Sequence, residues 1–163
     1  MAEAWITRLV EDERRRDGVR DRQLEAAAQK VELVRRHGRE LIEALRATVT
    51  RDVDAFRLEF PGDQNRDVKI DEQTEGGFLV HKAGTPSVSL AVNPRWQAGL
   101  VSCRYRFMLN NGLPAREHCF DLVLTDNGGD APHFRHQDSG ELFATVDALS
   151  AYLLTPVFTG RPR

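Results

Sequence analysis

Residues 21–56 read DRQLEAAAQKVELVRRHGRELIEALRATVTRDVDAF, and this stretch decides the fold. Apolar or small residues recur in it at steps of three and four: Leu24, Ala27, Val31, Val34, Gly38, Leu41, Leu45, Val49, Val53 and Phe56. Such spacing places one apolar stripe along an α-helix, with arginines and carboxylates on the remaining surface. A helix of this length spans roughly 50 Å, which exceeds what a compact domain of this size needs to cover one sheet. We therefore expect part of the stripe to contact something outside its own fold.

The residues before this stretch begin as an amphipathic turn or two. Trp5, Ile6, Leu9 and Val10 share a face, and the run EDERRRD follows at residues 11–17. Glycine inside a helix costs about 1 kcal/mol relative to alanine, so the sequence favours a break or kink near Gly18, although one very long helix also fits. With a break, Trp5 and Leu9 would fold back or dock on a partner.

The long helix is expected to end near Phe56, and residues 58–60 are expected to form a short extended piece before a turn at residues 61–63. Beyond this turn the apolar period changes from 3.6 to 2. Alternating runs occur at residues 68–71, 78–82, 87–93, 100–108, 117–124 and 132–136. Glycine, asparagine and proline separate these runs, as at Asn110-Asn111-Gly112 and Asn127-Gly128-Gly129. This pattern predicts an antiparallel meander of five to seven strands with one face packed on a core.

The chain ends with a predicted short helix. Thr145 is a suitable N-cap, the apolar residues through Leu153 continue the helix, and Pro156 is expected to stop it. The predicted fold class is α+β, with a long N-terminal helix, a meander and a short C-terminal helix, both helices lying on one face of the sheet. The predicted organisation is an N-terminal helical arm at residues 1–60 and one globular unit, sheet plus closing helix, at residues 61–163.

The composition is that of an ordinary globular protein. Of 163 residues, 40% are hydrophobic and 29% charged, and the formal net charge is -2. Basic and acidic residues are balanced in both halves of the chain, which argues against general nucleic-acid binding. No apolar run approaches the ~20 residues of a membrane span, and no signal-peptide pattern follows Met1. The cytoplasm is the expected location.

Histidines and cysteines provide one set of candidate reactive groups. His81, Cys103, Cys119 and His133 would form a ligand-binding or catalytic pocket if at least two of them converged. His133 and His136 would bind metal only if their segment were a loop that also brought in Asp130, Asp138 or Glu141. No catalytic residue, metal or cofactor is assigned from these patterns.

Two arginines form a different candidate surface. Arg104 and Arg106 lie two apart on the longest predicted strand and therefore share its polar face. Together with Arg135 they would bind single-stranded nucleic acid, or an acidic partner, if they formed a contiguous positive patch. A solvated outer face with cross-strand ion pairs is the simpler interpretation.

The sequence therefore favours a non-enzymatic protein-interaction or assembly module that associates through its N-terminal helices, with itself or with another protein. The expected interaction residues are Trp5, Leu9, Leu24, Val31, Arg104 and Arg106. A homo-oligomer is expected and no membrane is involved. A small ligand-binding or catalytic domain is the alternative, and nucleic-acid binding the third hypothesis.

Overall fold

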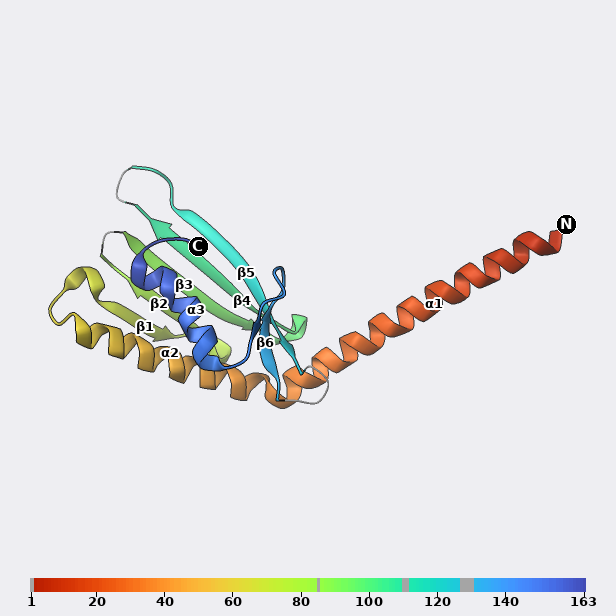
Figure 1. The fold of residues 1–163 in the computed structure, drawn as a ribbon, viewed down its shortest axis with the longest axis horizontal. Coiled ribbons are helices and arrows are strands. Elements are labelled where there is room, and N and C mark those ends of the chain that lie inside the picture. Colours follow the sequence, from red (N-terminus) through yellow and green to blue (C-terminus); the bar gives the residue numbers. More distant parts are fainter. Residues whose placement is uncertain (1, 85, 110–111, 127–130) are drawn as a thin grey trace.

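The computed structural model describes residues 2–84, 86–109, 112–126 and 131–163. The predicted turns at Asn110–Asn111 and at Asn127–Gly129 lie outside these residues. The chain begins with one continuous helical rod made of α1 (Ala2–Leu33), a π-helical turn η1 (Val34–Gly38) and α2 (Arg39–Glu59), and this rod bends at η1 (Figure 1). A sheet and a closing helix, α3 (Val146–Thr159), follow. This arrangement confirms the predicted α+β fold.

The sheet is a seven-stranded antiparallel meander with its strands in chain order. The strands are β1 (Val68–Glu72), β2 (Phe78–Lys82), β3 (Ser87–Arg95), β4 (Leu100–Met108), β5 (Arg116–Thr125), β6 (His133–His136) and β7 (Leu142–Phe143). β3 and β4 form the longest ladder, from Ser87 opposite Met108 to Arg95 opposite Leu100. Short connections between neighbouring strands require this antiparallel arrangement.

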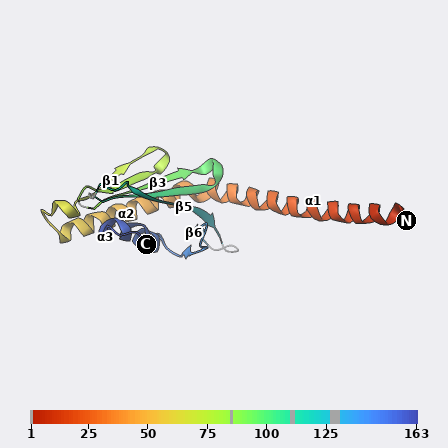
Figure 2. The same cartoon turned by 90° about the horizontal axis from the view of Figure 1, so that it is seen from above.

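Both packed helices lie on the same face of the sheet, as predicted (Figure 2). Strand alternation sends Val88, Leu90 and Val92 of β3 to this face, where all three are fully buried. From α2, the side chains of Ile42, Leu45, Val49 and Val53 enter the same core. α1 does not join this layer and extends away from the body (Figure 1).

The predicted break at Gly18 is wrong, because α1 continues through this residue without interruption. The glycine penalty of about 1 kcal/mol is opposed by a series of ion pairs three residues apart, each worth ~0.2–0.5 kcal/mol. These pairs are Asp12–Arg15, Glu13–Arg16 and Asp17–Arg20. Trp5 and Leu9 therefore do not fold back onto the chain.

The rod changes its hydrogen-bond pattern at η1, where it leaves the body. This π-helical turn closes at Gly38, the only residue of the turn that is fully buried. A Cβ at Gly38 would lie 3.3 Å from the indole ring of Trp96, in the short helix η4 (Trp96–Ala98). The missing side chain therefore lets the β3–β4 connection pack against the helix backbone.

The structure also corrects two predicted helix ends. α2 ends at Glu59, so Leu58 and Glu59 are helical instead of extended. Pro156 lies inside α3 and does not stop it. Proline has no N–H for the carbonyl of Tyr152, and the guanidinium of Arg163 donates to that carbonyl instead and stacks on the Tyr152 ring. The helix ends at Thr159, and Gly160, which has a φ of 70°, caps it.

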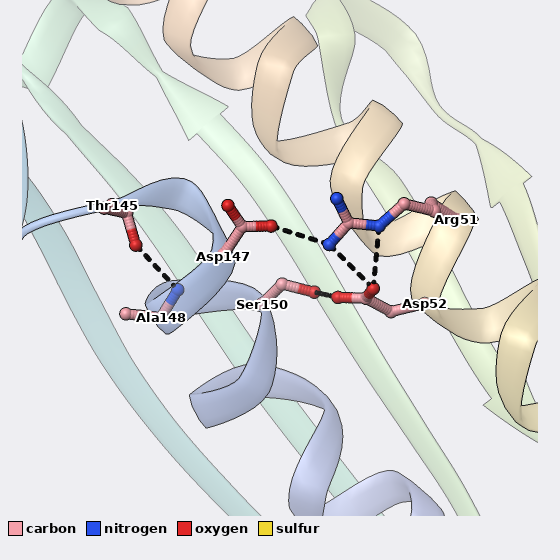
Figure 3. Close-up of polar contacts among 6 residues, drawn as sticks. All are labelled: Arg51, Asp52, Thr145, Asp147, Ala148 and Ser150. Atoms are coloured by element: carbon pink, nitrogen blue, oxygen red, sulfur yellow. Dashed lines mark hydrogen bonds and ion pairs between the residues drawn. The ribbon is translucent and has the colours of Figure 1, made fainter.

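A polar cluster joins α2 to the start of α3 (Figure 3). The buried hydroxyl of Ser150 donates to Oδ2 of Asp52 over 2.7 Å. Arg51 donates to Oδ1 of Asp52 and to Oδ1 of Asp147, the latter over 2.6 Å. Thr145 caps α3 by accepting the backbone N–H of Ala148. The cluster fixes the two helices side by side on the sheet.

Leucine at Gly38 is expected to destabilise the protein by about 1–3 kcal/mol, because it would push into the Trp96 ring. Gly18→Leu is the matched control, since the atom nearest to a Cβ there is a flexible arginine nitrogen 4.0 Å away. Urea unfolding should show a lower midpoint for Gly38→Leu alone. Equal midpoints for the two variants would contradict the packing role of Gly38.

Removing the Ser150 hydroxyl should cost about 1.5–3 kcal/mol of stability, because the half-buried Asp52 carboxylate loses a charge-assisted hydrogen bond from a buried hydroxyl. Asp147→Ala should cost less, since both partners of the Arg51–Asp147 ion pair are more than half exposed. Thermal unfolding of Ser150→Ala and Asp147→Ala tests this order. A larger loss for Asp147→Ala would show that the ion pair is the main contact.

Candidate functional site

The largest uncovered feature of the molecule is the surface of α1. Its 32 residues correspond to about 48 Å of helix, and Figure 1 shows it projecting from the body as a single rod. Seven large apolar side chains on it are exposed to solvent, among them Trp5 at 59%, Leu24 at 63% and Val31 at 59%. The others are Ile6, Leu9, Val10 and Val19.

The apolar stripe read from the sequence is divided by the π-helical turn. On the α2 side, Leu45, Val49 and Val53 are buried under the sheet. On the α1 side, Leu24 and Val31 of the same stripe face solvent. Soluble proteins rarely leave such a stripe open, and a regular apolar stripe along a helix is a typical protein-binding surface.

Ile6 and Val10 belong to the same line of residues as Leu24 and Val31. Steps of three and four connect Val10 to Leu24 through Glu13, Asp17 and Arg20. We name the apolar members Ile6, Val10, Leu24, Ala27 and Val31 the exposed stripe. From the sequence, Trp5 and Leu9 were expected to be interaction residues, and Ile6 and Val10 were not selected. The steps of three and four through Glu13, Asp17 and Arg20 are the sequence signal that identifies Ile6 and Val10.

Trp5 and Leu9 lie toward one edge of the exposed stripe. At 100° per residue both are rotated to the same side of the line through Ile6 and Val31. Each remains about half exposed. They would contact the rim of a partner that covers the exposed stripe.

The predicted reactive residues are distributed over the whole sheet. Cys103 is buried on the core face of β4, whereas Cys119 is exposed on the opposite face of β5. His81 lies on β2, where its Nε2 is 2.8 Å from Oδ2 of Asp71, and His133 is at the start of β6. The structure brings no two of these four side chains together in one pocket among the described residues.

His133 and His136 lie on opposite faces of β6 because they are three residues apart on a strand. His136 is buried, stacks on Phe120, and accepts the backbone N–H groups of Asp138 and Ser139 through Nδ1. Within residues 2–84, 86–109, 112–126 and 131–163, no group of three or more metal-binding side chains converges. Asp130, the other predicted ligand, lies outside these ranges.

Arg104 and Arg106 share the uncovered outer face of the sheet. Arg104 is flanked across the strands by Ala91 and Cys119, and Arg106 by Ser89 and Glu117. Arg135 is also exposed on this face, but it pairs with Val123, which is opposite Leu100. It therefore lies four to six residues away along β4 from the other two arginines, and the three do not form one patch.

A small cavity of about 140 Å³ lies between the core face of the sheet and α3. Tyr105, Phe120, Tyr152 and Arg163 contribute to its walls. Sites for small-molecule ligands usually enclose roughly 300–1,000 Å³, so this space fits a few waters better than a substrate. A larger hollow of about 640 Å³ is lined by Leu58, Phe60 and Pro61 together with charged side chains. These charges already form ion pairs, as between Arg66 and Asp63.

The two thiols should differ in reactivity. Burial raises the pKa of the Cys103 thiol well above its usual range, with a contribution from the Asp121 carboxylate, whereas Cys119 is exposed. Ellman's reagent should therefore modify Cys119 in the native protein, and Cys103 only after unfolding. The Cys119→Ser variant is the control, and rapid native labelling of that variant would contradict the buried position of Cys103.

In the part of the chain that the structure describes, no helix combines the length and apolar character required to cross a membrane. The chain matches no protein-family model, no curated protein and no solved structure.

Proposed function

We propose that this protein is a non-enzymatic assembly module that binds another protein chain, a second copy of itself, through α1. The observation that carries the proposal is the exposed stripe on a helix that projects from the body (Figure 1). The proposal requires no cofactor, metal or membrane, and we retain the cytoplasm as the expected location.

The energetics of α1 support the proposal that it binds a partner. Most helical stability in proteins comes from packing an apolar face, and isolated helices depend on weak local contacts. Among the described residues, the side-chain hydrogen bonds and ion pairs of α1 before Glu32 are local, between residues three or four apart. A partner that covers the exposed stripe would supply the packing that the body does not.

Several side chains must be covered at once for such a contact to be stable. Burying one Val, Leu or Ile completely is worth about 1.5–3 kcal/mol, and association itself costs about 4–15 kcal/mol. A contact restricted to Leu24 or Val31 would therefore not hold two chains together. A partner of similar length, lying along the helix, would cover the whole exposed stripe.

The charge pattern of α1 indicates a protein partner. The arginines in residues 11–21 are interspersed with carboxylates, and three ion pairs link neighbours in this segment. Their fields cancel, so the segment does not form the positive surface that nucleic acids or anionic lipids bind. Arg104 and Arg106 on the outer sheet face have Glu117 beside them and add a secondary, weaker contact surface.

The mass of the full chain in solution tests the proposal. Sedimentation equilibrium should give twice the 18.4 kDa of one chain. Leu24→Glu with Val31→Glu should weaken association at least ~10-fold, because two charges would have to be desolvated in the contact.

Ala26→Glu with Gln29→Glu is the matched control, since it adds the same two charges to the opposite face of the same helix. This variant should keep the mass of the unmodified chain. If all three proteins have the mass of one chain, or if both variants dissociate equally, the exposed stripe is not the contact surface.

A further inference from the structure

We infer that two copies of α1 pair along their full length in antiparallel orientation, with the two-fold axis passing between Gly18 and Val19. This inference rests on the proposed function and specifies its geometry. It follows from the residues that occupy the contact line of α1, which we name the seam.

The seam has apolar ends and a charged centre. Steps of three and four give Ile6, Val10, Glu13, Asp17, Arg20, Leu24, Ala27, Val31 and Val34. These positions correspond to a and d of a heptad, the positions that meet a partner helix in a coiled coil. All of them except Val34 are exposed in this structure, and Val34 is half-buried at the junction with the body.

Parallel pairing in register would place like charges together. Glu13 would meet Glu13 of the second copy, Asp17 would meet Asp17, and Arg20 would meet Arg20. Like charges at close range in a contact that excludes water repel each other strongly. Three successive layers of this kind, in the middle of the seam, disfavour the parallel arrangement.

Antiparallel pairing places opposite charges together. In antiparallel coiled coils an a position meets a d position of the partner, and the register centred between residues 18 and 19 sets Asp17 against Arg20 twice by symmetry. The same register sets Ile6 against Val31 and Val10 against Ala27. Leu24 meets Glu13, whose methylene groups can cover the leucine while its carboxylate reaches water.

The residues beside the seam agree with this register. Arg14 comes opposite Asp21 of the second copy, again twice by symmetry. Leu9 lies against Lys30, whose aliphatic stem already packs on Gly99 in this structure. Exposed ion pairs contribute little affinity, but they select orientation and register.

The length of α1 also agrees with this antiparallel register. In this register Glu3 of one copy reaches the level of Val34 of the other, where the helix joins its own body at η1. The whole projecting helix is then covered, and the two bodies lie at opposite ends of the pair. A shift by one heptad in either direction would leave apolar residues at one end uncovered.

Distances between labels on the two copies test the orientation. Nitroxide labels are placed one at a time at positions 8, 15, 22 and 29, which all point away from the seam, in the full chain carrying Cys119→Ser. In antiparallel pairs the two labels are offset along the axis by about 32 Å at positions 8 and 29, and by about 10 Å at positions 15 and 22. Parallel pairs give the same distance at all four positions, because the two labels then lie at the same level along the axis.

A charge exchange tests the register. Arg14→Glu should weaken pairing at least ~10-fold, and adding Asp21→Arg should restore it to within ~3-fold of the unmodified chain. Arg14 and Asp21 are seven residues apart in the same helix and form no ion pair with each other within one chain, so recovery indicates contact between copies. Helix content by circular dichroism should be equal for the two variants.

The outcomes separate this inference from the proposed function. Shorter distances at positions 15 and 22 than at positions 8 and 29, together with recovery in the double variant, support the antiparallel pair. A dimer with equal distances at all positions, or without recovery, overturns the antiparallel register and leaves assembly through α1 standing. A chain that sediments as a monomer overturns both.

Discussion

The structure depends on one apolar face of the sheet, which is long enough to bury only a limited length of helix. β3 and β4, which form the longest ladder of the sheet, have nine residues each, or about 30 Å, and α2 with 21 residues is about 32 Å long. The strands and α2 therefore have matching lengths, and α2 and α3 together cover the apolar face of the sheet. The helix continues beyond this limit, and its stripe emerges into solvent at the π-helical turn. Burial by the sheet, rather than a change in the apolar period, separates the buried half of the rod from the exposed half.

The junction between the two halves is built from small contacts. Gly38 lets the Trp96 ring approach the helix backbone, and Gly99, with a φ of 70°, lies against the stem of Lys30. The β3–β4 connection thus holds the last turn of α1 as well as η1. A projecting helix is useful for assembly only if its direction is fixed, because a partner must otherwise restrict its motion at an entropic cost. The contacts at the junction fix the direction of α1 relative to the body.

The sequence predicts the features that follow from the spacing of apolar residues. It fails at helix ends where a residue distant in the chain compensates for a local helix breaker. Alternation placed Val88, Leu90 and Val92 on the core face, and the three-four spacing identified Leu24 and Val31. Gly18 and Pro156 were expected to end helices because each does so in isolation. At Pro156, Arg163 supplies the missing donor, and only the fold brings that side chain back to Tyr152. The π-helical turn has no signature in the spacing. For the candidate site, the stripe was predictable, whereas its division into buried and exposed halves depends on the size of the sheet.

The charged centre of the seam has a physical reason in the proposed pair. A seam that was apolar throughout would bury more surface, but it would pair equally well in both orientations and in several registers. Glu13, Asp17 and Arg20 remove apolar contact and thereby lower the affinity. In exchange, they make the parallel pair repulsive, because that pair brings like charges together. The shifted registers are disfavoured because they leave apolar residues at one end uncovered. A helix that must hold two bodies at a fixed separation needs one register more than it needs maximal affinity.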